Sequence, residues 1–407
     1  MDVIAEAASA GGVADGQAFA GRARVLAVWA ALSGLVLLPV LLVPVPALVD
    51  YANHLARNWI LARGSHIPLL LTNYVIHWRV IADLAMDVMV RSLSTVMPVE
   101  AAGKLFVILT VLGLIAGTAA LHKALWGQVG LWPAVCVFFV YDSVLYWGIV
   151  DCLFGMGVFL LAFSLWIVSA PWRPVARLLV FSLIACGLLL LHLFAYGVYG
   201  LAIGSYEFGL FWRRRSLRRF GMCCLWGTQF LPSVVLWWIA FRNGEGTFTE
   251  YGNFAAKLYA LMSAVNFGQQ AVLLDWACVL LVVVFLIFAL ALKWLHIHPA
   301  MRLPLVVMLI AAALMPSWLT GSWGADFRLP TALAFLTIAG SELRLPRRTA
   351  FVFAGTALLL LGLRVWGTSA GWLDYNANLR EFRRAAQVIT PGSRMLVVEV
   401  PPTGAEK

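Results

Sequence analysis

The sequence has too little charge for a water-soluble protein of its length. Of its 407 residues, 12% are Asp, Glu, Lys or Arg and 62% are hydrophobic. A soluble domain usually has about 25% charged residues. So little charge cannot cover a water-exposed surface of this size, which excludes a soluble enzyme, a disordered chain and a nucleic-acid-binding module. The composition predicts a polytopic membrane protein with no nucleic-acid partner.

Motifs with strong chemical signatures are also missing. The six cysteines lie in apolar stretches without a CxxC spacing, so no disulfide framework or zinc site is expected. The sequence has no Walker A, GxGxxG, HExxH or GxSxG framework, which argues against nucleotide-driven pumps, zincins and α/β-hydrolases. Because nucleotide sugars are cytosolic, a sugar donor that reacts on the outer face would have to be lipid-linked.

Long apolar runs are abundant. A helix needs roughly 20 apolar residues to cross the hydrocarbon core, and this measure predicts about eleven spans in an all-α polytopic bundle. Their expected limits are 24–44, 104–122, 131–149, 153–170, 176–194, 197–212, 219–241, 272–294, 303–321, 328–343 and 348–367.

The formal net charge of +10 is explained by Lys and Arg in the loops of one side. Cytoplasmic loops are enriched in these residues. With a cytoplasmic N-terminal tail at 1–23, the inner loops include the arginine-rich run 213–219, whereas the opposing short loops contain Arg328 alone. This pattern predicts a C-terminus on the outer side of the membrane.

Three long segments fall on the outer face of the transmembrane domain 24–367. They are a first loop at 45–103, a second loop at 242–271 and a C-terminal tail at 368–407. Loops of this length are usually functional, so we expect the function at the outer surface.

Amphipathic stretches occur in two of these outer segments. In the first loop, residues 50–61 and 78–90 have apolar and polar faces at helical spacing, which is typical of helices lying in the membrane interface. In the tail, a helix at 375–388, a Pro391-Gly392 turn and a strand at 395–400 are expected to form a small outer cap.

The strongest local signal is a set of four polar residues directly after the first span. Asp50, Asn53, His54 and Arg57 have the spacing i, i+3, i+4, i+7, so a helix places them on one face. A carboxylate beside an imidazole can take a proton from a hydroxyl group or hold a divalent cation. The alternative is an interfacial helix whose polar residues simply face water.

Two further carboxylates, Asp83 and Asp87, are spaced i, i+4 on the second expected helix of this loop. Such a pair repels unless a cation or a substrate lies between its members. Alternatively, each forms an ion pair one turn away, as Arg79/Asp83 and Asp87/Arg91.

Ionisable residues also lie near the outer ends of the spans. Asp142 is a functional candidate by default inside a membrane, with cavity lining and a buried hydrogen-bond network as the alternatives. Asp151 is interpreted as a solvated residue near the surface, and His192 as a histidine packed within the bundle.

Two more outer positions favour substrate binding. Arg328 begins a late span, where its guanidinium can bind a lipid phosphate, snorkel, or pair with Asp326. Glu250 and Tyr251 lie in a polar, Gly-rich second loop, which suits either a cover over a sugar or an ordinary turn.

The chain resembles the C-type (GT-C) integral-membrane glycosyltransferases, specifically the group of protein mannosyltransferases and lipid A aminoarabinose transferases. The stretch Asp50-Tyr-Ala-Asn53-His54-Leu-Ala-Arg57 is similar to an Asp-Tyr-Pro-Asn-His-Leu-Ala-Arg motif of an uncharacterised bacterial branch. Asp326-Phe-Arg328-Leu-Pro330 resembles the Arg-Tyr-Leu-Leu-Pro stretch of the lipid A enzymes.

This resemblance implies transfer of a sugar from a polyprenyl-phosphate donor to an envelope glycan, lipid or protein, at the periplasmic face of a bacterial inner membrane. Asp50 would be the base or a metal ligand, Asp83 or Asp87 the second acid of the first loop, and Arg328 the residue that holds the polyprenyl phosphate. Together with the residue patterns above, this gives Asp50, His54 and Asp87 as the expected catalytic residues, with Mg²⁺ or Mn²⁺ as a candidate ion at Asp50. The expected substrate-binding residues are Asn53, Arg57, Asp83, Asp142, Glu250, Tyr251 and Arg328.

The chain departs from the family pattern because it has no paired Asp-Glu or Asp-x-Asp after the first span. A lipid or solute transporter, a flippase and a non-catalytic scaffold subunit are therefore the alternatives. A transferase requires Asp50 and Arg328 to line one cavity, with the 242–271 loop over it.

Overall fold

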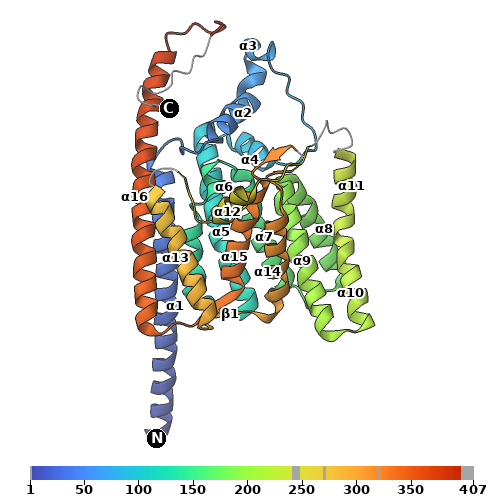
Figure 1. Ribbon diagram of the computed structural model, residues 1–407, viewed down its shortest axis with the longest axis vertical. Coiled ribbons are helices and arrows are strands. Elements are labelled where there is room, and N and C mark those ends of the chain that lie inside the picture. Colours follow the sequence, from blue (N-terminus) through green and yellow to red (C-terminus); the bar gives the residue numbers. More distant parts are fainter. Residues whose placement is uncertain (1, 241–247, 269–271, 320, 396–407) are drawn as a thin grey trace.

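The computed structural model describes residues 2–240, 248–268, 272–319 and 321–395, and these residues are overwhelmingly helical (Figure 1). The first half of the chain forms α1 (Asp2–Leu42), α2 (Tyr51–Arg63), η1 (Gly64–His66), α3 (Pro68–Leu71), α4 (Ala85–Leu93), α5 (Val99–Trp126), η2 (Trp132–Phe139), α6 (Ser143–Tyr146), α7 (Val150–Val168), α8 (Pro174–Leu191) and α9 (Leu193–Arg214). The second half forms α10 (Leu217–Gly227), η3 (Thr228–Phe230), α11 (Leu231–Ala240), α12 (Phe254–Met262), α13 (Val272–Ala291), η4 (Pro299–Met301), α14 (Arg302–Leu314), α15 (Ala325–Ala339) and α16 (Arg347–Ala386).

Strand structure in the described residues is limited to two small antiparallel pairs. Strand β1 (Leu295–Ile297) pairs with β4 (Ser341–Leu343), with Leu295 opposite Leu343. Strand β2 (Trp318–Leu319) pairs with β3 (Ser322–Trp323) in a short hairpin directly before α15.

The expectation of an all-α membrane protein is confirmed by the length and composition of the helices. Within the described residues, seven helical segments are long and apolar enough to cross a membrane: Gly21–Leu42, Val99–Trp126, Val150–Val168, Pro174–Leu191, Leu217–Ile239, Val272–Ala291 and Arg347–Ala386. Two of the other expected spans correspond to the shorter apolar segments Trp132–Tyr146 and Pro299–Leu314. The count of about eleven stays a prediction.

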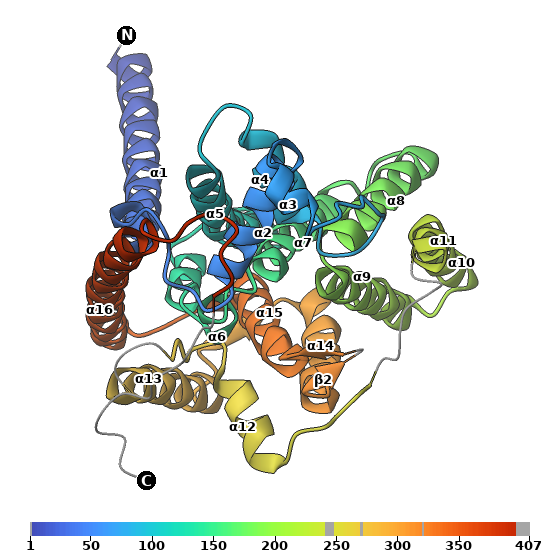
Figure 2. The ribbon, with the colours of Figure 1, turned by 90° about the horizontal axis from the view of Figure 1, so that it is seen from above.

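The centre of the bundle is the contact between α5 and α7, which small residues make possible. A Cβ atom on Gly157 would lie 2.8 Å from the backbone carbon of Gly113, and one on Gly117 would lie 2.7 Å from Cβ of Leu160. Close approach through glycines is a common way to pack helices in membranes. The view along the bundle shows α5 and α7 side by side near its centre (Figure 2).

The first outer loop contains one of the two expected helices at its predicted position. Helix α2 covers the 50–61 stretch, but the 78–90 stretch is irregular until α4 begins at Ala85. Asp83 has a φ of 65°, in the left-handed region, and Leu84 N–H donates to the carbonyl of Leu190 at 3.0 Å. The prediction of a helix over the whole 78–90 stretch is wrong because this segment pairs with the end of α8 instead.

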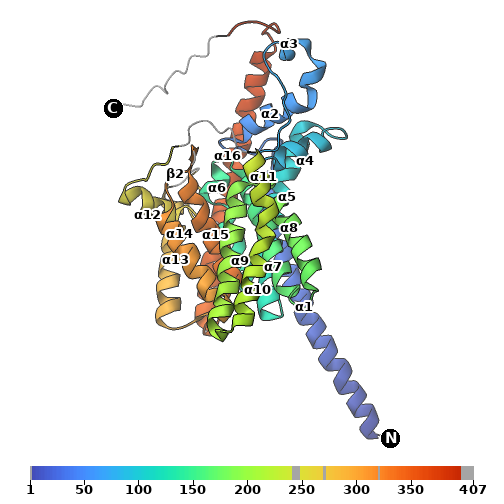
Figure 3. The ribbon, with the colours of Figure 1, turned by 90° about the vertical axis from the view of Figure 1, so that its right-hand side faces the viewer.

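The tail also differs from its prediction. The residues expected to form a separate helix at 375–388 belong almost entirely to α16, which spans 40 residues without interruption. Asn376 anchors this part of α16, because its side-chain amide accepts from the N–H and donates to the carbonyl of Val45. The end of α16 extends past the bundle on the side of α2 and α3, opposite the projecting start of α1 (Figure 3). The strand expected at 395–400 lies, beyond its first residue, outside the described residues.

Candidate functional site

Asp50 is held at the start of α2 by its backbone. Its N–H donates to the carbonyl of Trp147 at 3.1 Å, and the preceding Val49 N–H donates to the carbonyl of Tyr146 at 3.0 Å. Gly148 makes this approach possible, since a Cβ there would lie 2.8 Å from the Asp50 nitrogen, and its φ is 78°. The turn after α6 therefore fixes where the Asp50 side chain begins.

The polar face predicted for α2 is present, and its first three residues form a local group. Asn53 Nδ2 donates to Asp50 Oδ1 at 3.0 Å, and the His54 N–H donates to the Asp50 carbonyl at 3.1 Å. The Asp50 carboxylate does not cap its own helix. Asn53 thus orients the carboxylate of Asp50, which lines the cavity described next.

A polar cavity of about 250 Å³ lies where the first outer loop meets the bundle. It brings together three carboxylates, two imidazoles, one guanidinium and two indoles. The lining residues are Asp50, His54, Asp83, Trp147, Ile149, Asp151, His192, Ser322, Trp323 and Arg328. The expectation that Asp50 and Arg328 line one cavity agrees with this geometry.

Arg328 projects from the first turns of α15 and is buried. Its Nη2 donates to Ser322 Oγ at 3.2 Å and to the Trp323 carbonyl at 3.1 Å, while its Nε has no partner among the described residues. Asp326, the partner suggested by the sequence, instead accepts from Ser317 Oγ at 2.7 Å. The β2–β3 hairpin therefore holds the guanidinium through neutral acceptors, and its charge acts on the Asp83 carboxylate of the same cavity.

Asp83 faces a histidine across the cavity rather than the arginine that the sequence suggested. His192 Nδ1 accepts from the Phe194 N–H at 3.1 Å, so a neutral ring carries its proton on Nε2. That Nε2 lies 3.5 Å from Asp83 Oδ1. Because Asp83 precedes α4, it is not one turn before Asp87, and the Arg79/Asp83 pair is absent from the described residues.

Asp87 lies behind the cavity, not in its lining. It forms an ion pair with Arg57, and their side chains are 5% and 51% exposed. Arg91, its expected partner, instead lies over the Trp78 ring at 4.7 Å. Burial raises the pKa of the Asp87 carboxyl, and the charge of Arg57 opposes that rise. Asp87 and Arg57 support His54 from outside the cavity, so a direct catalytic role for Asp87 is not favoured.

His54 is half-buried, and the carboxylates of Asp50 and Asp87 both act on it. Burial lowers its pKa below the usual 6.5, although Asp50 and Asp87 both act in the opposite direction. A lowered pKa keeps the imidazole neutral at neutral pH, where it can accept a proton. The neutral imidazole of His54 therefore lies close to the Asp50 carboxylate at the start of α2.

Asp142 belongs to a buried network and does not line the cavity. Its carboxylate accepts from the Leu145 N–H at 2.8 Å, capping α6, and from the Thr331 hydroxyl at 2.7 Å on α15. Of the two interpretations left open by the sequence, this geometry favours the hydrogen-bond network. Asp142 therefore locks the turn carrying Trp147 to the helix carrying Arg328.

Glu250 and Tyr251 are exposed and lie outside the cavity lining. Glu250 pairs through its backbone with Trp318, in both directions at 3.1 Å. The hairpin that receives it supplies Ser322 and Trp323 to the cavity, and the Phe248 ring lies 5.1 Å from the Trp318 ring of the same hairpin, so the second loop contacts this hairpin through both backbone and side chain. Residues 242–247 and 269–271 of that loop lie outside the described residues.

Two cavity residues were interpreted as ordinary from the sequence. Asp151 is buried and accepts from the Met86 N–H at 2.8 Å, which ties α4 to α7. His192, interpreted as a packed histidine, lines the cavity. The missed signal is that both are ionisable residues at the ends of apolar helices, which are functional candidates by default.

Within the described ranges, no three His, Cys, Asp or Glu side chains lie close enough together to hold a metal ion. Zinc sites usually have at least three protein ligands, whereas Mg²⁺ is held by one or two carboxylates together with substrate phosphates and water. The role of Asp50 as a ligand of Mg²⁺ or Mn²⁺ therefore stays a prediction.

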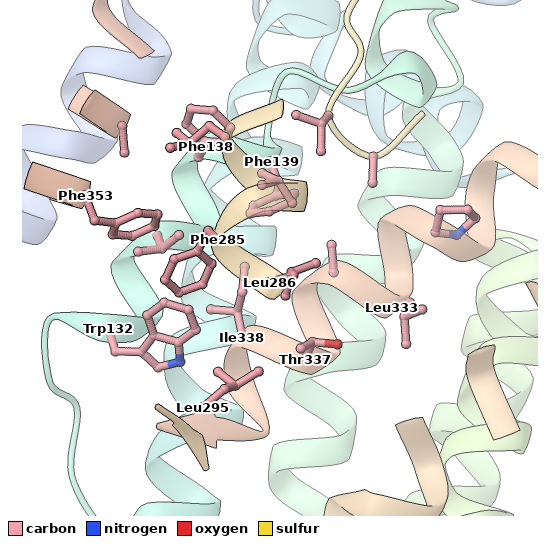
Figure 4. A pocket seen from close by; sticks show the side chains of 18 of the residues that line it. Trp132, Phe138, Phe139, Phe285, Leu286, Leu295, Leu333, Thr337, Ile338 and Phe353 are labelled. Atoms are coloured by element: carbon pink, nitrogen blue, oxygen red, sulfur yellow. The ribbon is translucent and has the colours of Figure 1, made fainter. Parts of the chain in front are cut away.

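A second, apolar cavity of about 220 Å³ lies further along α15. Figure 4 shows the aromatic rings of Trp132, Phe285 and Phe353 on one side and Leu333 and Ile338 of α15 on another. Five residues of helix, or about 7.5 Å, separate Leu333 from Arg328. One helix thus lines a polar cavity near its start and an apolar cavity along its length.

No protein-family model, curated protein or solved structure matches this chain. The assignment of function therefore depends on the geometry of the site.

Proposed function

We propose that this protein is a membrane glycosyltransferase of the GT-C type, with about eleven spans, acting at the periplasmic face of a bacterial inner membrane. It transfers a sugar from a polyprenyl-phosphate donor to an acceptor in the cell envelope. The observation that carries this proposal is the single cavity shared by Asp50, at the start of α2, and Arg328, at the start of α15. A carboxylate and a guanidinium facing one space provide the base and the phosphate clamp of such a transfer.

The reaction assigns each charged group one task. An acceptor hydroxyl attacks the anomeric carbon of the donor sugar, and the new C–O bond forms as the bond to the phosphate breaks. The electron pair leaves with polyprenyl phosphate, whose charge Arg328 stabilises. The hydroxyl proton passes to Asp50, with His54 as the neighbouring acceptor.

The remaining cavity residues position the substrate. Trp147 and Trp323 lie edge to face, with ring centres 4.6 Å apart, and give the sugar an apolar surface. Asp83, paired with His192, offers an acceptor for the sugar hydroxyl groups. These four residues line the cavity wall, and the proposed reaction does not require Asp83 or His192 to change its charge.

A polyprenyl phosphate carries a charged head and a long hydrocarbon chain. Arg328 receives the head in the polar cavity. The apolar cavity shares no lining residue with the polar one, and its α15 residues Leu333, Ala334 and Thr337 lie largely on the other side of that helix from Arg328. The hydrocarbon chain is therefore expected to leave the polar cavity toward the surrounding bilayer.

The test is an Asp50→Asn substitution assayed in nanodiscs with a panel of polyprenyl-phosphate sugars. Asn keeps the shape of Asp50 and removes its basic carboxylate, so we expect transfer to fall by a factor of about 100 or more. Mass spectrometry measures the polyprenyl phosphate released. The matched control is Asp374→Asn, an exposed carboxylate on α16 outside the cavity.

Full transfer by the Asp50→Asn variant would remove Asp50 as the base. If the unaltered protein releases polyprenyl phosphate from no donor of the panel, the scaffold subunit becomes the better interpretation. Movement of an intact donor between leaflets without release of its sugar would instead favour a flippase.

A further inference from the structure

A second charged cavity lies at the opposite end of the bundle from Asp50. It measures about 240 Å³ and is formed where α7 and α9 end and α8 and α10 begin. In Figure 1 this region is at the base of the bundle, with α2 and α4 at the other end. Its lining includes Arg177, Arg214, Arg219 and a single carboxylate, Glu207. The cavity therefore has an excess of positive charge.

Arg177 lies in this cavity against two indole rings. Its guanidinium lies 3.6 Å from the centre of the Trp166 ring and 4.5 Å from that of Trp226. Its Nη2 donates to the Trp166 carbonyl at 2.7 Å, and its Nε donates to Ser169 Oγ at 3.2 Å. Neither acceptor is charged, so the positive charge of Arg177 is not neutralised by these contacts.

The Glu207 carboxylate already accepts hydrogen bonds from two side chains of the cavity. It accepts from Trp166 Nε1 at 2.9 Å and from Arg219 Nη2 at 2.7 Å. The Nε of Arg219 is buried and has no partner among the described residues. A donor left without a partner in a cavity of excess positive charge is the arrangement that a phosphate group satisfies.

The surroundings place this cavity at the level of lipid head groups. Two apolar segments long enough to cross a membrane begin here, Pro174–Leu191 and Leu217–Ile239. Beside them, Trp212 is 57% exposed and Phe220 is 51% exposed. Exposed aromatic rings at the ends of spans are typical of the membrane interface, and basic pockets between helices at this depth bind anionic head groups.

We infer that this cavity binds the phosphate group of an anionic membrane lipid in the leaflet opposite to the Asp50 cavity. Arg219 donates to the phosphate through its free Nε, and Arg177 and Arg214 supply the compensating charge. The inference does not depend on the proposed transferase activity, because no residue of the Asp50 cavity takes part.

The test measures binding of three probes to the full-length protein in detergent micelles: phosphatidylglycerol, phosphatidylcholine and inorganic phosphate. We expect phosphatidylglycerol to bind most tightly. An Arg219→Gln substitution weakens that binding about tenfold, the usual effect of losing one charge-assisted hydrogen bond. The matched control is Arg218→Gln, which removes an exposed arginine outside the lining and leaves the affinity within about twofold.

A second variant keeps the inference testable if Arg219→Gln fails to fold. Glu207→Gln retains an acceptor for Trp166 and Arg219 but removes the negative charge, so a phosphate site binds the lipid more tightly. Unchanged or weaker binding in Glu207→Gln overturns the inference, as do equal losses in Arg219→Gln and Arg218→Gln. Inorganic phosphate binding as tightly as the lipid retains the phosphate site and overturns the lipid as its source.

Discussion

At the scale of single residues, the Arg57–Asp87 pair is asymmetric. The Asp87 side chain is 5% exposed, whereas that of Arg57 is 51% exposed. Removing Arg57 leaves a buried carboxylate without its counter-charge, whereas removing Asp87 leaves an arginine that water can solvate. The two substitutions are therefore expected to have unequal costs.

We predict that Arg57→Gln lowers the free energy of unfolding by about 1–3 kcal/mol and that Asp87→Asn lowers it less. Burial already raises the pKa of Asp87, so the fold tolerates a neutral side chain there. The double variant recovers part of the loss. Denaturation in detergent measures all three, and a larger loss in Asp87→Asn than in Arg57→Gln would show that the pair is not governed by burial of the carboxylate.

His54 gives a prediction on pH. Burial lowers its pKa below 6.5, so the fold favours the neutral imidazole. This contribution to stability is fully present above pH 6.5 and is lost as the pH falls through the lowered pKa. The difference in melting temperature between the protein and a His54→Gln variant is expected to be largest above pH 6.5 and to shrink below it. A difference that grows as the pH falls would contradict the sign of the shift.

At the scale of elements, the turn after α6 determines where α2 starts. Gly148 combines a φ of 78° with a close approach to the Asp50 nitrogen. Gly127, at the end of α5, has a φ of 80°, but a Cβ atom added there would meet nothing within 4 Å. Both glycines avoid the same conformational strain. Only Gly148 also avoids a collision with the site.

We predict that Gly127→Ala costs about 1 kcal/mol and Gly148→Ala about 2–4 kcal/mol. Only Gly148→Ala displaces Asp50, so that variant alone loses sugar transfer. Thermal melting and the nanodisc assay measure the two effects. Equal costs in both variants would mean that the contact between Gly148 and Asp50 relaxes without consequence.

The sequence predicts where helices form better than it predicts which residues contact one another. The spacing of Asp50, Asn53, His54 and Arg57 is sufficient to predict α2, since helical periodicity records which face of a segment is apolar. The same reasoning fails at Asp83, because its left-handed backbone and the bond from Leu84 to Leu190 depend on α8, far along the chain. Local pattern contains no information about such a neighbour.

At the scale of the whole molecule, the apolar runs predict the bundle but not the lengths of its helices. The run at 131–149 forms the short elements η2 and α6 instead of one long helix. The tail continues α16 because no proline interrupts it and Asn376 anchors it to Val45. The convergence of α2 and α15 on one cavity depends on this packing, which composition and local pattern do not contain.

We propose that the cavity between α2 and α15 binds the phosphate of a polyprenyl lipid. Electron cryo-microscopy of the protein in nanodiscs loaded with a long-chain polyprenyl phosphate tests it most directly. We expect phosphate density against the Arg328 guanidinium, in the cavity that Asp50 lines. Phosphate density bound elsewhere on the bundle, with no lipid density beside Arg328, would contradict it.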